Sequence, residues 1–281
     1  MTRRVSSIVI FFAAGCGTQP TFLLPDAAVP SPTSSEHRFD RSGCGTITGR
    51  VTWAGALPET PTFLYGVAAD GGNFVTKTLS GPYQPRIDPK SHGLSGVVVS
   101  LRGVDPAASR PWDHPPVRVE IAGGSIRVIQ GGVGRVGFVR RFAEVPFASG
   151  EPVYHILRGR GDDFFSLALP AADSPRVRKF ERPGRVELSS GTGLYWARAD
   201  LFVADHPYWA LTDDAGRFSL PQVPAGRVEV VAWHPNWRPA RQDRDPETGL
   251  VSRMTYAPPL ERTTPVEVTA GMTCDVALSF E

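Results

Sequence analysis

The sequence has almost no excess charge, few cysteines and no hydrophobic run long enough to cross a membrane as a helix. Among 281 residues, 30 lysines and arginines stand against 28 acidic residues, so the net charge is +2. That balance supplies no field that would gather nucleic acid, and we expect no nucleic-acid partner. The longest apolar run, at 5–14, is shorter than the roughly 20 residues that a bilayer-spanning helix needs.

Long amphipathic helical patterns are also missing, whereas glycine (29) and proline (27) are abundant. These residues punctuate short valine-rich runs, as expected of strands joined by turns. Residues 46–53 alternate polar and apolar, which predicts a strand with one buried face, and 96–101 predict a strand buried on both faces. Further strands are predicted within 208–233 and 264–280. The predicted fold class is therefore all-β.

The first residues have the pattern of a targeting signal. Arg3 and Arg4 precede the apolar run, and small residues lead to Cys16. This arrangement resembles a bacterial lipoprotein signal, which implies removal of 1–15, lipidation of Cys16 and a periplasmic or cell-surface protein anchored to a bacterial membrane. The alternative is an ordinary cleaved secretion signal. The proline- and serine-rich remainder of 16–43 predicts a flexible tether in the cell envelope.

Two further cysteines, Cys44 and Cys274, lie in the first and last predicted strands. Outside the cytoplasm such a pair can oxidise, and a disulfide closing so long a loop would contribute about 2–4 kcal/mol. Cys274 is in phase with the apolar positions of its strand, whereas Cys44 is out of phase with Ile47 and Val51. A disulfide and two separate buried thiols are both compatible with the sequence.

Two motifs resemble carboxypeptidase regulatory-like repeats, which are small transthyretin-like β-sandwiches. The first is Gly-Thr-Ile-Thr-Gly-Arg-Val at 45–51, and the second contains Thr-Asp-Asp-Ala-Gly-Arg-Phe at 212–218. The motifs lie close together in such repeats but far apart here, so the resemblance implies an insertion. We predict a sandwich formed by 44–104 plus 204–281, with a second domain at 105–203.

The inserted stretch resembles plastocyanin-like cupredoxins of the methylamine utilization type. The resemblance rests on Trp196, on Asp-His-Pro-Tyr at 205–208 and on the Trp-His pair at 233–234. That family holds type 1 copper with a cysteine, two histidines and a methionine. Counted along this chain, the four ligand positions fall on Asp163, Gly191, Leu194 and Ala197. Because no cysteine lies within 105–203, we predict a degenerate cupredoxin-like domain without copper or another cofactor.

No nucleophile-elbow or zinc-protease motif surrounds any of the six histidines, so we predict no enzymatic activity. His155 is read as an ordinary strand residue, and the Asp162–Asp163 pair as a solvated turn rather than a metal site. The aromatic residues near 208–237 are predicted to pack in the core. Trp237, in a polar loop, is predicted as the exception and as a ligand-binding surface.

The predicted function is that of a non-enzymatic, extracytoplasmic lipoprotein that serves as a binding or scaffold module. Its expected partners are the membrane, through the lipid anchor, and an envelope protein or glycan. Two alternatives from other classes are a copper-binding electron-transfer protein of the methylamine utilization type and a carbohydrate-binding module.

Overall fold

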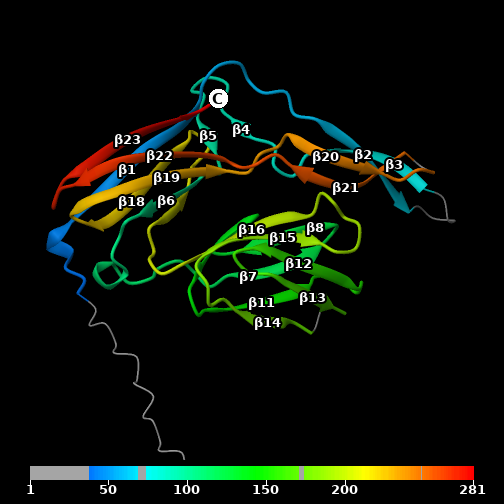
Figure 1. The fold of residues 1–281 in the computed structure, drawn as a ribbon, viewed down its shortest axis with the longest axis horizontal. Coiled ribbons are helices and arrows are strands. Elements are labelled where there is room, and N and C mark those ends of the chain that lie inside the picture. The colour runs from blue at the N-terminus through cyan, green and yellow to red at the C-terminus, as the bar shows by residue number, and fades with distance from the viewer. Residues whose placement is uncertain (1–37, 69–73, 171–173, 248) are drawn as a thin grey trace, which may run out of the picture. The chain divides into compact units, whose positions relative to one another are not determined.

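The computed structural model describes residues 38–68, 74–170, 174–247 and 249–281 (Figure 1). Within these ranges the chain is built from strands and has no α-helix, which confirms the all-β sandwich class. Two short 3-10 turns, Arg41–Gly43 and Pro106–Ala108, are the helical segments of the described ranges. The predicted signal at 1–15, Cys16 and most of the tether lie outside the described residues. A search of the described ranges finds no helix with the length and apolarity to cross a membrane.

Strands from the two ends of the described chain form one sandwich, here called the terminal sandwich. Its three-stranded sheet has the order β18-β1-β23, and its four-stranded sheet has the order β17-β6-β19-β22. The strands are β1 (Cys44–Trp53), β6 (Val98–Arg102), β17 (Trp209–Leu211), β18 (Arg217–Pro224), β19 (Gly226–His234), β22 (Leu260–Val268) and β23 (Thr273–Phe280).

The core of the terminal sandwich lies between these two sheets. β1 buries alternate residues such as Ile47 and Val51, which face Val99 and Val230 of the four-stranded sheet across one continuous apolar cluster. Period-two alternation in the sequence therefore becomes one dry face for each sheet.

Trp237 belongs to this core, so the prediction that it forms a ligand-binding surface is wrong. Its side chain is 2% exposed and packs edge-on against Trp53, with ring centroids 5.4 Å apart. The loop that carries Trp237 is polar, but the indole ring turns inward because it is the largest apolar group available to close this end of the sandwich.

The structure forms no disulfide between Cys44 and Cys274. β1 and β23 run parallel, with Ile47 opposite Cys274, so Cys44 lies three residues out of register. That offset is roughly 10 Å along a strand, beyond the reach of a disulfide. Instead, the Cys44 thiol donates to the backbone oxygen of Asp40 at 3.1 Å.

The chain between β6 and β17 forms a second sandwich, here called the central sandwich. One of its five-stranded sheets has the order β14-β11-β7-β8-β9, and the other has the order β10-β16-β15-β12-β13. The first sheet consists of β7 (Arg118–Ala122), β8 (Ser125–Ile129), β9 (Val133–Gly134), β11 (Glu144–Ser149) and β14 (Arg176–Lys179). The second sheet consists of β10 (Val136–Arg140), β12 (His155–Gly161), β13 (Phe165–Leu169), β15 (Gly184–Ser190) and β16 (Arg198–Ala204).

The second of these sheets carries apolar residues on both faces. Its inner face, with residues such as Leu157, Val186 and Leu201, closes the core of the central sandwich. On its outer face, Phe202 packs against Trp233 of the terminal sandwich, with ring centroids 5.1 Å apart, and against Trp209 at 5.3 Å. The two sandwiches therefore share a small aromatic cluster.

Three hairpins complete the fold, namely β2 (Thr62–Ala68) with β3 (Phe74–Ser80), β4 (Arg86–Ile87) with β5 (Leu94–Ser95), and β20 (Pro239–Arg244) with β21 (Val251–Tyr256). β2 contacts β21. Phe63, Val251 and Met254 from these hairpins bury Tyr195, which belongs to the loop between β15 and β16. This contact brings the β20–β21 hairpin to the central sandwich.

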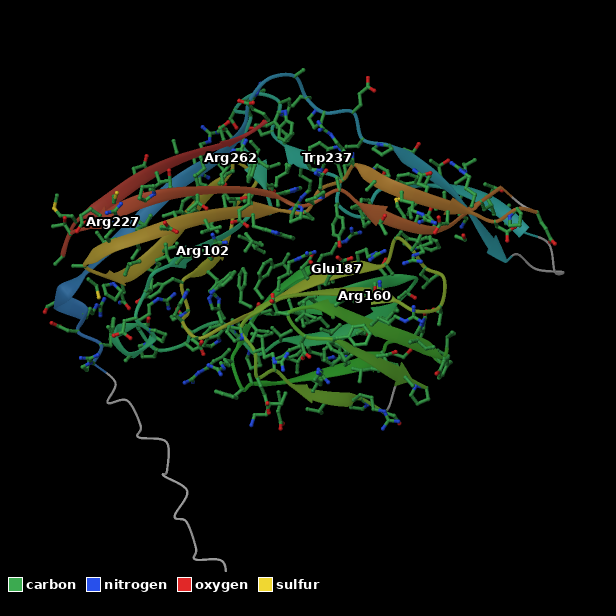
Figure 2. The ribbon with its side chains drawn as sticks, viewed as in Figure 1. Arg102, Arg160, Glu187, Arg227, Trp237 and Arg262 are labelled. Carbon is green, nitrogen blue, oxygen red and sulfur yellow. The ribbon has the colours of Figure 1, made fainter. Side chains whose placement is uncertain are left out.

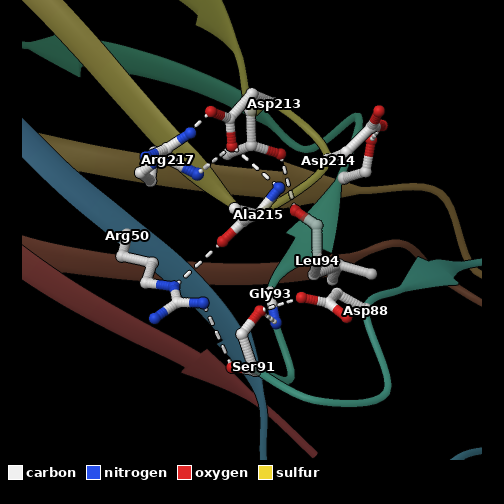
Figure 3. Close-up of polar contacts among 11 residues, drawn as sticks. Arg50, Asp88, Ser91, Gly93, Leu94, Asp213, Asp214, Ala215 and Arg217 are labelled. Atoms are coloured by element: carbon white, nitrogen blue, oxygen red, sulfur yellow. Dashed lines mark hydrogen bonds and ion pairs between the residues drawn. The ribbon is translucent and has the colours of Figure 1, made fainter.

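The turn at 213–216 joins three parts of the terminal sandwich (Figure 3). The Asp213 carboxylate accepts hydrogen bonds from the backbone N–H of Ala215 at 2.9 Å and of Arg217 at 2.8 Å. Arg50 of β1 donates to the Ala215 carbonyl at 2.9 Å and to the Ser91 carbonyl at 3.2 Å. The turn therefore fixes β1 against the loop between β4 and β5.

Gly216 lies at this junction where the neighbouring backbone leaves no space for a side chain. Its φ is +77°, and an added Cβ would lie 2.2 Å from the backbone oxygen of Val51. We predict that Gly216→Ala lowers the free energy of unfolding by more than about 2 kcal/mol, because left-handed strain adds to a clash with backbone atoms. Gly55→Ala is the control: its φ of +83° is similar but its surroundings are open, so about 1 kcal/mol is expected. Equal losses in urea denaturation would contradict the close approach.

Candidate functional site

The outer face of the β10–β16–β15–β12–β13 sheet changes from aromatic to charged across its width. Cross-strand register places Arg160, Glu187 and Asp200 in one row on β12, β15 and β16. The next row contains Arg158, Ser189 and Arg198. Directly opposed residues point to the same side of a sheet, so these side chains share the outer face. The inward neighbours of each row are the core residues that hold it in place.

The β20–β21 hairpin covers part of this charged face and leaves a groove. The inner hollow of this groove has a volume of about 320 Å³ and lies between the sheet, β21 and the segments around Tyr83, Asn236 and Pro258. The outer hollow, of about 260 Å³, is lined by the sheet, the loop after β15 and β21. Both hollows are lined by Arg160, Arg198 and Arg253, so they adjoin. We call the whole the arginine groove, after its lining arginines Arg158, Arg160, Arg185, Arg198 and Arg253.

Two of these arginines are anchored by carboxylates. Arg185 contacts the buried Asp200 carboxylate at 2.6 Å and Glu187 at 3.4 Å, and its guanidinium stacks 4.7 Å from the ring of Trp233. Arg198 pairs with Glu187 and donates to the backbone oxygen of Met254 at 2.9 Å. This last bond ties β16 to β21. Arg185 and Arg198 are therefore held rigidly at the floor of the groove.

The other three arginines have no such anchor. Arg158, Arg160 and Arg253 are exposed, and none forms an ion pair with another residue of the described ranges. Glu187 is the one carboxylate in the described lining, and it already pairs with two arginines. The groove thus presents a surplus of positive charge within partly enclosed walls, where charge acts more strongly than on open surface.

Two tyrosines, Tyr83 and Tyr256, belong to the lining of the inner hollow. The hydroxyls of Tyr83 and Tyr256 are buried and have no hydrogen-bond partner among the described residues. Their rings meet edge-on with centroids 5.0 Å apart. Burial raises the pKa of both hydroxyls, so both stay protonated and can donate as well as accept.

Asp200 is the least exposed charged group of the site, at 1%. Burial raises the pKa of its carboxyl to about 6, because loss of water outweighs the attraction of Arg185. Between its unfolded pKa of about 4 and its folded pKa of about 6, the folded protein binds more protons at Asp200 than the unfolded chain does. The contribution of Asp200 to stability is therefore present below pH 4 and is lost as the pH rises to 6.

We predict that Asp200→Asn removes this pH dependence. Relative to the variant, the unmodified protein should lose about 3 kcal/mol of unfolding free energy between pH 4 and pH 6.5 and stay level above that. Denaturant titrations of both proteins at half-unit pH steps measure this difference. A difference that grows in favour of the unmodified protein as the pH rises would mean that Arg185 lowers the pKa instead.

Three of the four positions counted as lost copper ligands lie together. Gly191, Leu194 and Ala197 belong to the loop between β15 and β16, and Gly191 lines the outer hollow. Leu194 and Ala197 pack onto the core of the central sandwich. The loop is held to the start of β12, since the N–H of Gly191 donates to the carbonyl of Ile156 at 2.7 Å.

Asp163 does not join them, which corrects the position counted from the sequence. It follows the far end of β12, roughly 20 Å from Ile156 along an extended strand. There it receives hydrogen bonds of 2.8 Å from Arg178 of β14. Asp162 is likewise at that end, where it accepts from the backbone N–H of Arg185 at 2.8 Å. The histidine at the near end of β12 is His155, whose Nε2 lies 2.9 Å from Glu151.

The residues around this loop do not fit type 1 copper. A glycine, a leucine and an alanine offer no donor side chain, and His155 supplies a single imidazole already bonded to Glu151. Cys44 and Cys274, the thiols of the described chain, lie in β1 and β23 of the terminal sandwich. No group of three or more His, Cys, Asp or Glu side chains in the described ranges is placed to hold a metal ion.

The arginine groove was not predicted from the sequence. Its signal was present as polar or charged residues at every second position, in Arg-Gly-Arg at 158–160 and Arg-Val-Glu-Leu-Ser at 185–189. Such alternation predicts a charged strand face, but it does not reveal that β21, from far along the chain, covers that face.

Among the comparisons with known proteins, the matches are to solved structures. No protein-family model and no curated protein sequence matches this chain. It is similar to the Cu-containing nitrite reductase NirK from Thermus scotoductus SA-01, with 16% identity and a TM-score of 0.27, over 37% of this chain and 24% of the reductase. It is also similar to two single-residue mutants of amicyanin in the oxidised state, with 11% and 13% identity and TM-scores of 0.26. These matches cover 37% and 38% of this chain and 99% and 98% of amicyanin. All three neighbours are cupredoxins.

Proposed function

We propose that this chain is a non-enzymatic, extracytoplasmic binding protein that holds an anionic ligand in the arginine groove. The observation that carries the proposal is the surplus of arginine over carboxylate in a partly enclosed groove. Guanidinium groups are suited to carboxylate, phosphate and sulfate because their N–H donors match the paired oxygens of these anions. Arg185 and Arg198 are held by their carboxylate partners, while Arg158, Arg160 and Arg253 are available.

A binding role is favoured over catalysis by the make-up of the lining. No histidine or cysteine lines the two described hollows, and the single carboxylate is occupied by Arg185 and Arg198. A general base or activated nucleophile needs a group that is free to exchange a proton near neutral pH. The groove offers fixed donors instead, which suit recognition.

In this proposal the central sandwich is a cupredoxin-like scaffold without copper, and the terminal sandwich is its carboxypeptidase regulatory-like partner. Cys16 carries the lipid anchor, and the tether at 16–43 connects the anchor to the folded part. The groove would then face ligands in the periplasm or at the cell surface. An envelope glycan or an acidic envelope protein supplies anionic groups of the required kind.

We predict that the triple variant Arg158→Gln, Arg160→Gln, Arg253→Gln binds polyanions at least about tenfold more weakly than the unmodified protein. Polygalacturonate, poly-L-glutamate and polyphosphate are suitable probes, measured by thermophoresis in about 50 mM salt. Binding of the unmodified protein should weaken as salt rises, because counterions compete for the arginines.

The matched control removes three exposed arginines from the terminal sandwich, Arg102→Gln, Arg227→Gln and Arg262→Gln (Figure 2). The charge change is identical, but these three arginines do not line the groove, so this variant should keep its affinity. Equal losses in the two triple variants, or no binding of any probe by the unmodified protein, would contradict the proposal.

Copper provides a separate test of the scaffold. We predict that the purified protein incubated with Cu(II) shows no intense visible absorption of the thiolate-to-copper kind and keeps no stoichiometric copper after desalting, because the two thiols of the described residues, Cys44 and Cys274, lie in the terminal sandwich and His155 lies in the central one. Atomic absorption after desalting measures this. Retention of one copper per chain, with the blue absorption, would favour an electron-transfer protein instead.

A further inference from the structure

We infer that two histidines, His114 and His206, form an acid-sensitive latch between the two sandwiches, and that protonation of their rings loosens the contact between the sandwiches. The chain passes from one sandwich to the other twice, through 103–117 and through 205–208. Each passage carries one of these histidines. The inference is independent of the arginine groove and of its ligand.

The two passages are hydrogen-bonded to each other. Nε2 of His114 lies 2.8 Å from the carbonyl oxygen of Pro207, and because a carbonyl only accepts, this nitrogen carries the proton. The backbone N–H of Arg110 donates to the hydroxyl of Tyr208 at 3.0 Å. Tyr208 is buried, and its hydroxyl donates to the backbone oxygen of Gln222 in β18 at 2.7 Å. The passage that enters the central sandwich is therefore bonded to the passage that leaves it.

The hydrogen bonds of His206 require a neutral imidazole. The backbone N–H of Tyr208 points to Nδ1 of His206 at 3.3 Å, and an N–H can only donate, so Nδ1 has no proton. The backbone of Leu101, in β6 of the terminal sandwich, forms a second hydrogen bond with this imidazole. Protonation of Nδ1 places two donors opposite each other. A charged His206 therefore loses a bond that holds the chain just before β17.

Both imidazole rings flank the aromatic cluster through which the sandwiches meet. His206 stacks on Trp209 of the terminal sandwich, with ring centroids 6.2 Å apart and an angle of 20° between the planes. His114 packs against Phe138 of the central sandwich at 5.2 Å. Trp209 and Phe138 contact each other at 5.7 Å. A charge on either imidazole is therefore held beside apolar rings, where the loss of water makes it costly.

The charged neighbours of the two histidines are two carboxylates, Asp205 and Asp113, and the arginines that pair with them, Arg141 and Arg110. Burial acts more strongly than the neighbouring carboxylate on each ring, so the pKa of both histidines is lowered. Below about pH 6.5 the folded protein thus binds fewer protons at these rings than the unfolded chain does. Their contribution to stability is complete above that pH and is lost as the pH falls through the folded pKa values.

The test is a double variant, His114→Gln with His206→Asn, which cannot be protonated. The glutamine amide supplies a donor at the place of Nε2, and the asparagine carbonyl supplies an acceptor at the place of Nδ1. Hydrogen exchange measured by mass spectrometry on the full-length protein, at pH steps from about 7.5 to about 5, reports the opening of the two passages. Comparing the two proteins at the same pH cancels the intrinsic exchange rate and the titration of Asp200.

We expect both proteins to exchange alike in 103–117 and 205–208 at about pH 7.5. At about pH 5 the unmodified protein should exchange at least about fivefold faster than the double variant in these passages, while the cores of both sandwiches exchange alike. Asp205→Asn should move the onset of this difference to a lower pH, because it removes a carboxylate that favours the protonated ring of His206.

The control is His92→Asn, which removes an exposed histidine from the loop between β4 and β5 and should keep the acid response. If the double variant responds to acid like the unmodified protein, the latch does not exist. Slower exchange of the unmodified passages in acid would mean that charged imidazoles gain more from the aromatic rings than they lose by burial, which also overturns the inference. An unchanged onset in Asp205→Asn contradicts it without recourse to the double variant.

Discussion

The contact of Arg185 with both Trp233 and Asp200 is the constraint on which the arrangement of this molecule depends. The guanidinium lies 4.7 Å from the Trp233 ring of the terminal sandwich and 2.6 Å from the buried Asp200 of the central sandwich. On one side of it the two sandwiches meet through aromatic rings, with Phe202 packed on Trp233. On the other side the same sheet face is charged and hollow. This planar cation accepts both a ring face and a carboxylate as neighbours, so it links the apolar interface and the charged groove on one sheet face.

Much of the fold was readable from local pattern, because strand alternation and turn chemistry act over a few residues. The alternation at 46–53 became β1 with its buried Ile47 and Val51, and the Thr-Asp-Asp-Ala-Gly motif became a junction that requires glycine at 216. The wrong predictions concern side chains whose surroundings are formed by segments that are distant in the sequence. Trp237 is in a polar loop yet fills the core beside Trp53, and Cys44 is separated from Cys274 by the register of β1 with β23. The groove itself depends on the bond from Arg198 to Met254, two residues far apart in the sequence.

The position of Asp163 shows why counting along a chain is a weak guide to a metal site. A ligand position is defined by the end of the strand on which it lies, and Asp163, the position counted for the first ligand, comes after the far end of β12. The structure instead brings the loop at 191–197 against Ile156, next to His155. The lack of fit to type 1 copper does not depend on where Asp163 lies. The loop supplies glycine, leucine and alanine, and no cysteine belongs to the central sandwich.

The charged and unpaired polar groups in and around the groove lower the stability of the folded state, and this loss of stability bears on their role. Asp200 is ionised at neutral pH although burial raises its pKa to about 6, and two tyrosine hydroxyls are buried without described partners. Apolar side chains of similar size would fill the same space with less penalty, as replacements of buried ion pairs in proteins have shown. A purely mechanical joint between two sandwiches gains nothing from unpaired hydroxyls or from three unanchored arginines around a hollow. The three unanchored arginines repel one another in the empty groove and would gain partners from an anion, so the surplus of charge that weakens the folded protein is the feature that the proposed binding function uses.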